Sequence, residues 1–191
     1  MPAKREVEIK FKIDDGQALL QRLESSGFRQ VTPRTHERNT LYDQAGRQLL
    51  RRGALLRIRQ YGPKWTVTYK DRSKIGPARH KSRREIETAV HDGQALAAIL
   101  QAVGFEPSFA YEKFRSEWSD GTGHVVVDET PIGDFGEIEG PPQWIDQVAR
   151  RLGISKTQYI TASYAQLFLA WKRKTKSQAE QMLFSEAPRP I

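Results

Sequence analysis

The chain has 191 residues, of which 38% are hydrophobic and 28% are charged, enough to bury the core of one globular domain. It contains no cysteine, which excludes disulfides, thiolate catalysis and zinc–thiolate sites. Its apolar runs are too short to span a bilayer, and its first residues are charged where a secretory signal would be apolar. We therefore expect a cytoplasmic protein with no membrane partner. The net charge of +8 favours polyanionic partners.

Alternation of polar and apolar residues predicts strands, and three- to four-residue spacing of apolar residues predicts helices. In chain order the predictions are strand 5–13, helix 15–26, strands 37–44, 54–61, 64–71 and 82–88, helix 93–103, strands 112–119, 122–130 and 134–140, a helix from Pro141 or Pro142 to Leu152, and a longer helix at 155–175. Glycine-containing turns predict hairpins at Gly62, Gly121 and Gly133. The segment 71–82 has no periodicity and predicts a flexible basic loop. One domain at 1–176 and a flexible tail at 177–191 complete this interpretation.

Charged residues on the predicted strands are grouped by sign. Carboxylates occur as Glu-x-Glu pairs on three strands, whereas cations occur as Arg-x-Arg or Lys-x-Arg pairs on others. A single charged stripe is typical of a solvated sheet face. The separation of sign instead favours a closed sheet with helices outside and charges inside, because buried charges need opposite charges or bound ions. Carboxylates bind hard divalent cations and Arg and Lys bind phosphate oxygens, so the sequence predicts a metal–polyphosphate ligand.

Seven short motifs follow one another along the chain. They are Glu6-Val7-Glu8-Ile9-Lys10, Leu56-Arg57-Ile58-Arg59, Thr68-Tyr69-Lys70, Arg84-Glu85-Ile86-Glu87, Lys113-Phe114-Arg115, Asp128 and Gly136-Glu137-Ile138-Glu139-Gly140. With these motifs the chain resembles CYTH-domain proteins of the triphosphate tunnel metalloenzyme superfamily, which include class IV adenylate cyclases and thiamine triphosphatases. The resemblance covers residues 4–171. The last helix, with Tyr159, Ser163 and Tyr164, resembles the cyclase branch.

The resemblance implies a mainly β protein of the α+β class. Its fold would be an eight-stranded antiparallel closed barrel, or tunnel, with a charged interior and helices packed outside. It also implies a triphosphate-containing small molecule as partner and Mg²⁺ or Mn²⁺ as cofactor. The implied phosphate-binding residues are Lys10, Arg57, Arg59, Lys70, Lys113 and Arg115, to which strand parity alone adds Arg83. The implied metal ligands are Glu6, Glu8, Glu85, Glu87, Asp128, Glu137 and Glu139.

The opening motif supplies the catalytic candidates Glu6, Glu8 and Lys10, whereas Lys12, beyond the motif, is expected at the rim. Three activities remain open. The first is metal-dependent hydrolysis of inorganic triphosphate, a nucleoside triphosphate or thiamine triphosphate. The second is conversion of ATP to cyclic AMP and pyrophosphate. The third is non-catalytic binding of polyphosphate or of an RNA 5′-triphosphate end, the one nucleic-acid partner considered. Carboxylate pairs argue against the third, because they would repel phosphate in the absence of a metal.

Overall fold

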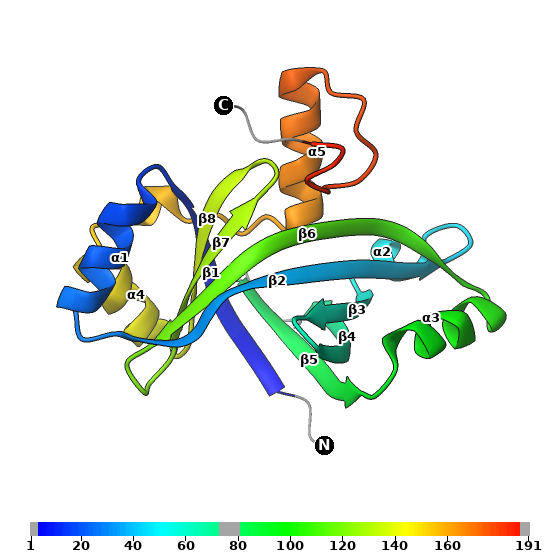
Figure 1. The fold of residues 1–191 in the computed structure, drawn as a ribbon, viewed down its shortest axis with the longest axis horizontal. Coiled ribbons are helices and arrows are strands. Elements are labelled where there is room, and N and C mark those ends of the chain that lie inside the picture. The colour runs from blue at the N-terminus through cyan, green and yellow to red at the C-terminus, as the bar shows by residue number, and fades with distance from the viewer. Residues whose placement is uncertain (1–3, 73–80, 188–191) are drawn as a thin grey trace.

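The strands of the computed structural model, which describes residues 4–72 and 81–187, close into one antiparallel barrel (Figure 1). They are β1 (Lys4–Ile13), β2 (Arg29–Gln44), β3 (Leu55–Tyr61), β4 (Lys64–Arg72), β5 (Lys81–Val90), β6 (Phe105–Ser119), β7 (His124–Thr130) and β8 (Gly133–Glu139). Their order around the barrel is β1-β5-β4-β3-β2-β6-β7-β8. The eight-stranded closed barrel expected from the sequence is therefore confirmed.

Helices cover the outside of this barrel. They are α1 (Gly16–Ser25), α2 (Gln48–Arg51), α3 (Gly93–Ala102), α4 (Pro142–Arg151), the short 3₁₀ helix η1 (Lys156–Gln158) and α5 (Tyr164–Thr175). Figure 1 shows α1 and α4 side by side against β1, β7 and β8, α5 beside β6 and α3 at the far end of the long β2–β6 pair. None of the helices in the described part of the chain is both long enough and apolar enough to cross a membrane.

The apolar faces of the strands point outward, toward these helices. Ile9 of β1 and Ile138 of β8 are fully buried, and they belong to one cluster with Leu23 of α1 and Val148 of α4. Because neighbouring residues of a strand point to opposite faces, this outward core sends the intervening charged residues into the barrel. A second cluster joins Phe168 of α5 to Tyr111 of β6 and Phe135 of β8, which have the strand parity of the inward residues Lys113 and Glu137.

Three features of the elements differ from expectation. Strands β2 and β6 begin at residues 29 and 105, earlier than the alternation indicated, because prolines and register shifts between them obscure the pattern. The four-residue helix α2 was not predicted. It is stabilised by the Asp43 carboxylate, which accepts hydrogen bonds from the backbone N–H groups of Leu49 and Leu50 at 2.8 and 3.0 Å.

The third difference concerns the expected helix at 155–175, which is wrong over its first half. After η1 the chain is extended, and the backbone of Ile160 exchanges hydrogen bonds with Lys10 at 2.7 and 3.1 Å. Ser163 then accepts the N–H of Gln166 in a capping box, so α5 begins only at Tyr164. The tertiary pairing with β1 and the strong cap together outweigh the helical periodicity.

Part of the expected flexible tail is fixed against β6. Met182 is fully buried, and its backbone N–H and C=O bond to Ala110 and Glu112, each at 3.1 Å. This packing covers β6 residues that lie beyond the end of its pairing with β7. Residues 188–191 of that tail lie outside the described residues. So does most of the basic loop expected at 71–82, whose two ends belong to β4 and β5.

Candidate active site in the barrel interior

Buried charges of both signs line the interior of the barrel. Each residue of this group is at most 9% exposed, and the group comprises Glu8, Lys10, Glu37, Arg57, Lys113, Arg115, Asp128 and Glu137. They come from β1, β2, β3, β6, β7 and β8. Charges removed from water to this degree need close partners of opposite sign. The contacts within the barrel show that they have them.

Asp128 is the centre of one part of this network. It is fully buried on β7, opposite Arg115 of β6, whose guanidinium donates to both carboxylate oxygens at 2.7 Å. The Lys113 ammonium donates to the same carboxylate at 2.8 Å. Arg115 also donates to Glu137 at 2.6 Å, and Lys10 donates to the other oxygen of Glu137. These five residues therefore form one connected group of cations and carboxylates.

The pKa of Glu137 shows how strongly these cations act. Burial alone would raise its pKa, but the charges of Lys10 and Arg115 outweigh burial and hold it well below the usual value. The pKa of Arg115 is raised, because Asp128 and Glu137 together outweigh the loss of hydration. Both groups therefore remain ionised at neutral pH.

Glu37 is a buried carboxylate at the junction of three cations, and the sequence did not point to it. It is fully buried on β2, and its oxygens lie 3.5 Å from Lys113, 3.7 Å from Arg115 and 3.8 Å from Arg59. Burial raises its pKa, yet the surrounding cations lower it far below the usual value. Glu37 does not belong to a Glu-x-Glu pair, which is why the pattern of paired carboxylates missed it. The one feature of the sequence that could have indicated it is a second polar residue, Asn39, on the same face of the strand.

A second group of charges lies on β1, β3, β4 and β5. The Lys70 ammonium lies 2.5 Å from Glu6 and 3.3 Å from Glu85. The Thr68 hydroxyl donates to Glu87 at 2.5 Å and accepts from Arg57 at 3.1 Å. Burial would raise the pKa of Glu87, but the hydrogen bond from Thr68 and the nearby arginines lower it. The cations and carboxylates predicted on these strands therefore meet across the barrel.

Two further predicted residues, Glu139 and Arg83, are placed by strand register. Glu8 of β1 stands opposite Glu139 of β8, and Glu6 of β1 stands opposite Arg83 of β5. Arg83 is half-buried and shares the parity of Glu85 and Glu87. By register, Arg83 and Glu139 thus share a strand face with Glu6 and Glu8. Lys12 is 67% exposed in its side chain and pairs with Asp14 at 3.1 Å, as expected of a rim residue.

Tyr164, the first residue of α5, reaches this network from outside the strands. Its hydroxyl donates to Asp128 at 2.6 Å, and the ammonium groups of Lys10 and Lys113 lie 4.3 and 4.7 Å from its ring centroid. Burial and the charge of Asp128 raise the pKa of this phenol well above its ordinary value, so it stays a donor. The sequence indicated Tyr164 only as part of a family resemblance and gave it no contact.

The carboxylates of the barrel interior are suitable ligands for a hard divalent cation, although the side chains that the structure describes are not clustered into a metal site. Among the described residues, no three His, Asp or Glu side chains are arranged to hold a metal ion. Several of them face cations instead, as Glu6 and Glu137 do. Glu8 and Glu139 stand directly opposite each other, a like-charge arrangement that a bound cation would stabilise. Oxygen ligands are also those that Mg²⁺ and Mn²⁺ prefer, so the donor set fits the metal.

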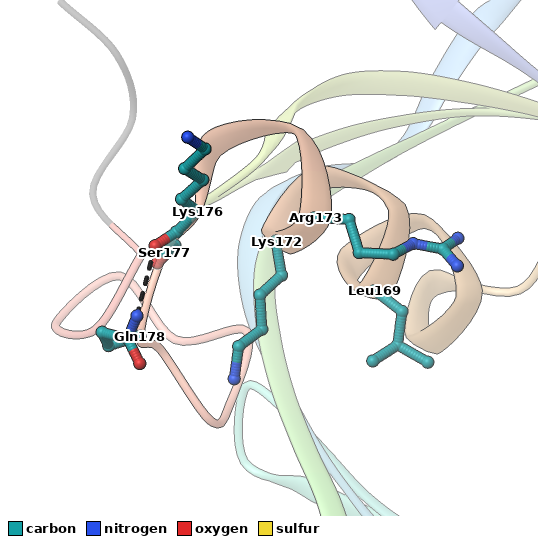
Figure 2. A pocket seen from close by; sticks show the side chains of 6 residues that line it. All are labelled: Leu169, Lys172, Arg173, Lys176, Ser177 and Gln178. Atoms are coloured by element: carbon teal, nitrogen blue, oxygen red, sulfur yellow. Dashed lines mark hydrogen bonds between the residues drawn. The ribbon is translucent and has the colours of Figure 1, made fainter.

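A separate hollow lies outside the barrel, at the end of α5 opposite to Tyr164 (Figure 2). Its volume is about 380 Å³, and it is lined by Leu169, Lys172, Arg173, Lys176, Ser177 and Gln178. The positive charges there follow the usual preference for cations at a helix C-terminus. The hollow contains no residue of the barrel network, so it is not part of the candidate site.

Known proteins resemble this chain over most of its length. The CYTH domain family model matches residues 4–164. A protein of Methanocaldococcus jannaschii with a provisional adenylate cyclase name is 28% identical over 173 residues, which cover 85% of this chain and 97% of that protein. The adenylate cyclase of Aeromonas hydrophila is 27% identical, with 85% of this chain and 87% of that protein covered.

Solved structures share the fold. A protein from Vibrio parahaemolyticus, provisionally described as an adenylate cyclase, has a TM-score of 0.75 at 20% identity, covering 87% of this chain and 98% of that one. A protein from Hippeastrum, provisionally described as an adenylyl cyclase with dominant triphosphatase activity, has a TM-score of 0.62 at 21% identity, covering 86% of this chain and 95% of that one. The match of the family model to most of the chain, together with the closed barrel, shows that the chain belongs to the CYTH domain family.

Proposed function

We propose that this protein is a divalent-metal-dependent triphosphatase that hydrolyses a phosphoanhydride bond of its substrate inside the barrel. The observation that carries the proposal is the enclosed interior, where buried Lys and Arg side chains face buried carboxylates. A triphosphate is rich in negative charge and binds divalent cations. A site for the triphosphate and its metal therefore needs both kinds of side chain in one place.

In this proposal the cations of β3 and β6 bind the phosphate oxygens. Arg57, Arg59, Lys113 and Arg115 now contact carboxylates at distances up to 3.8 Å. A bound triphosphate would replace those carboxylates as partner and release them. Held in the interior, the same cations would neutralise the charge that develops on the transferred phosphoryl group.

The carboxylates of β1 and β8 are the metal ligands of this proposal. Glu6, Glu8 and Glu139 would hold Mg²⁺ or Mn²⁺, with Glu85, Glu87, Asp128 and Glu137 as further candidates. When bound, the metal supplies positive charge that polarises a phosphoryl oxygen. A carboxylate of the interior that does not hold the metal orients the attacking water and accepts its proton. Lys10, between Glu8 and Glu137, holds a positive charge beside the reacting phosphate.

Adenylate cyclase activity is the second candidate function. It is favoured by the 27% identity to the Aeromonas hydrophila adenylate cyclase, which extends over 87% of that protein. The same phosphate and metal residues would serve both reactions, with a ribose hydroxyl in place of water as the nucleophile. The Hippeastrum protein, which is described as having dominant triphosphatase activity on the same fold, favours hydrolysis as the first choice.

Product analysis tests the proposal and separates the two reactions. Purified protein is incubated with inorganic triphosphate, ATP or thiamine triphosphate in the presence of Mg²⁺ or Mn²⁺. Hydrolysis of ATP yields ADP and phosphate, whereas cyclisation yields cyclic AMP and pyrophosphate. Release of phosphate from at least one substrate supports the triphosphatase. Cyclic AMP as the main product would replace it with the cyclase, and binding without turnover would contradict both.

A further inference from the structure

The inner face of β2, β3 and β4 contains polar atoms that lack hydrogen bonds. Among the described residues, every buried side-chain nitrogen or oxygen without a hydrogen-bond partner, apart from the indole nitrogen of Trp118, belongs to these three strands. The atoms are Oε2 of Glu37, Oδ1 of Asn39, Nε of Arg57, Nε of Arg59, the hydroxyl of Tyr61 and the hydroxyl of Thr66. Their concentration in one place distinguishes this face from the rest of the barrel.

These residues are also direct neighbours across the sheet. Arg59 of β3 stands opposite Asn39 of β2 on one side and Thr66 of β4 on the other. Tyr61, two residues along β3, stands opposite Glu37. We call the three neutral side chains Asn39, Tyr61 and Thr66 the polar wall. It therefore adjoins Arg59, one of the arginines assigned above to the phosphates.

Buried polar groups are rarely left without a hydrogen bond, because each one loses its water without replacement. Several such groups on one inner face are therefore expected where a ligand completes the bonding. A triphosphate would satisfy only part of this set, since its oxygens are acceptors. They can accept from the Nε atoms of Arg57 and Arg59, but they cannot donate to Asn39 Oδ1. Glu37 Oε2 already has Arg115 as its ion-pair partner at 3.7 Å. The missing partner must carry O–H or N–H groups close to its phosphates.

We propose that the polar wall binds the sugar hydroxyls of a nucleoside triphosphate, so that the protein prefers such substrates to inorganic triphosphate. This inference rests on the proposed function. A sugar hydroxyl donates to Asn39 Oδ1 and accepts from the Thr66 hydroxyl. Tyr61 borders the same site, where burial and the charge of Glu117 raise the pKa of its hydroxyl.

The test compares kcat/KM for ATP, 2′-deoxy-ATP, 3′-deoxy-ATP and inorganic triphosphate. It uses the wild type, Thr66→Val and Asn39→Leu, two nearly isosteric changes that remove hydrogen-bonding groups. Thr88→Val, on the exposed outer face of β5, is the matched control and leaves all four values unchanged. In the wild type we expect ATP to be preferred to inorganic triphosphate and at least one deoxy analogue to be about tenfold poorer than ATP.

Each wall variant should reduce the preference for ATP over inorganic triphosphate by about tenfold and weaken the discrimination against the deoxy analogue. Thr66→Val should not lower the thermal unfolding midpoint, because the hydroxyl that it removes has no hydrogen bond within the described residues. Equal turnover of ATP and inorganic triphosphate by the wild type would overturn the inference. An equal loss on both substrates in Thr66→Val would overturn it as well; Asn39→Leu is the weaker test, because it also removes the hydrogen bond from the Asn39 amide to Glu37 at 2.9 Å.

Failure of the proposed function would be visible separately, as the absence of turnover with every substrate and metal. Calorimetric titration of ATP and of inorganic triphosphate, each with Mg²⁺, then measures the same preference as binding. Tighter binding of ATP that is reduced by Thr66→Val and retained by Thr88→Val supports the polar wall as a sugar site. Equal affinities of the wild type for the two ligands contradict it.

Discussion

Glu37→Gln removes a fully buried negative charge from between Arg59, Lys113 and Arg115. The substituted amide also directs N–H groups at side chains that themselves only donate. Removal of one partner of a buried ion pair costs about 3–5 kcal/mol, since the remaining charges stay buried without compensation. For a chain of this size, that loss corresponds to a decrease of about 6–20 °C in the thermal unfolding midpoint.

The decrease should be reversible by an added anion. In the Glu37→Gln variant, Arg59, Lys113 and Arg115 repel one another without the carboxylate between them. Inorganic triphosphate, supplied with EDTA so that no metal takes part, provides negative charge that neutralises these cations. We therefore expect it to raise the unfolding midpoint of the variant by several degrees more than that of the wild type. Differential scanning calorimetry or fluorimetry with and without triphosphate measures both effects.

A charge control is available on the surface of the protein. Glu24 is exposed on α1, and Glu24→Gln should change the free energy of unfolding by no more than about 0.5 kcal/mol. The reasoning is refuted if Glu37→Gln unfolds within about 2 °C of the wild type, a change below 1 kcal/mol. It is also refuted if triphosphate stabilises the variant and the wild type equally, since the cations would then not depend on Glu37 for their neutralisation.

Two further predictions concern the same network. Tyr164→Phe removes the hydroxyl that donates to Asp128 and should reduce the free energy of unfolding by about 1.5–3 kcal/mol in urea titrations; a loss below about 0.5 kcal/mol would show that this bond contributes little. The folded-state pKa values of Glu37 and Glu137 are depressed, so the unfolded state binds more protons in acid. The stability that they contribute is complete above the unfolded-state pKa of about 4.3 and is lost as the pH falls toward their folded values. Urea midpoints measured between pH 7 and pH 3 should therefore decrease below pH 5, and a constant midpoint would contradict the ion pairing.

The sequence was most informative where strands are regular. On β1, β3 and β4, strand parity alone placed Glu6, Arg57 and Lys70 on the inner face, because a strand that buries one face has only one other face for its charges. Gly62 also predicted the hairpin between β3 and β4, and Gly121 and Gly133 predicted the connections from β6 to β7 and from β7 to β8. Pairing between strands, which brings Lys70 to Glu6, could not be obtained from parity.

The residues that the sequence missed depend on long-range contacts. Glu37 acquires its role only because β2 pairs with β6 and places it opposite Lys113, which lies far away in the chain. Tyr164 enters the network because the chain between η1 and α5 pairs with β1 at Lys10, in competition with a local helical pattern. The polar wall is defined by hydrogen bonds that are missing, and no sequence pattern shows a missing hydrogen bond.

The central claim is that the barrel interior hydrolyses a triphosphate with a divalent metal bound by its carboxylates. The most direct measurement is the initial rate of phosphate release from ATP by the wild type and Glu8→Gln, each with Mn²⁺ and with EDTA. We predict turnover by the wild type that EDTA abolishes and Mn²⁺ restores, and a loss of about 10²-fold or more in a normally folded Glu8→Gln variant. Turnover that persists in EDTA, or a Glu8→Gln variant as active as the wild type, would contradict the account.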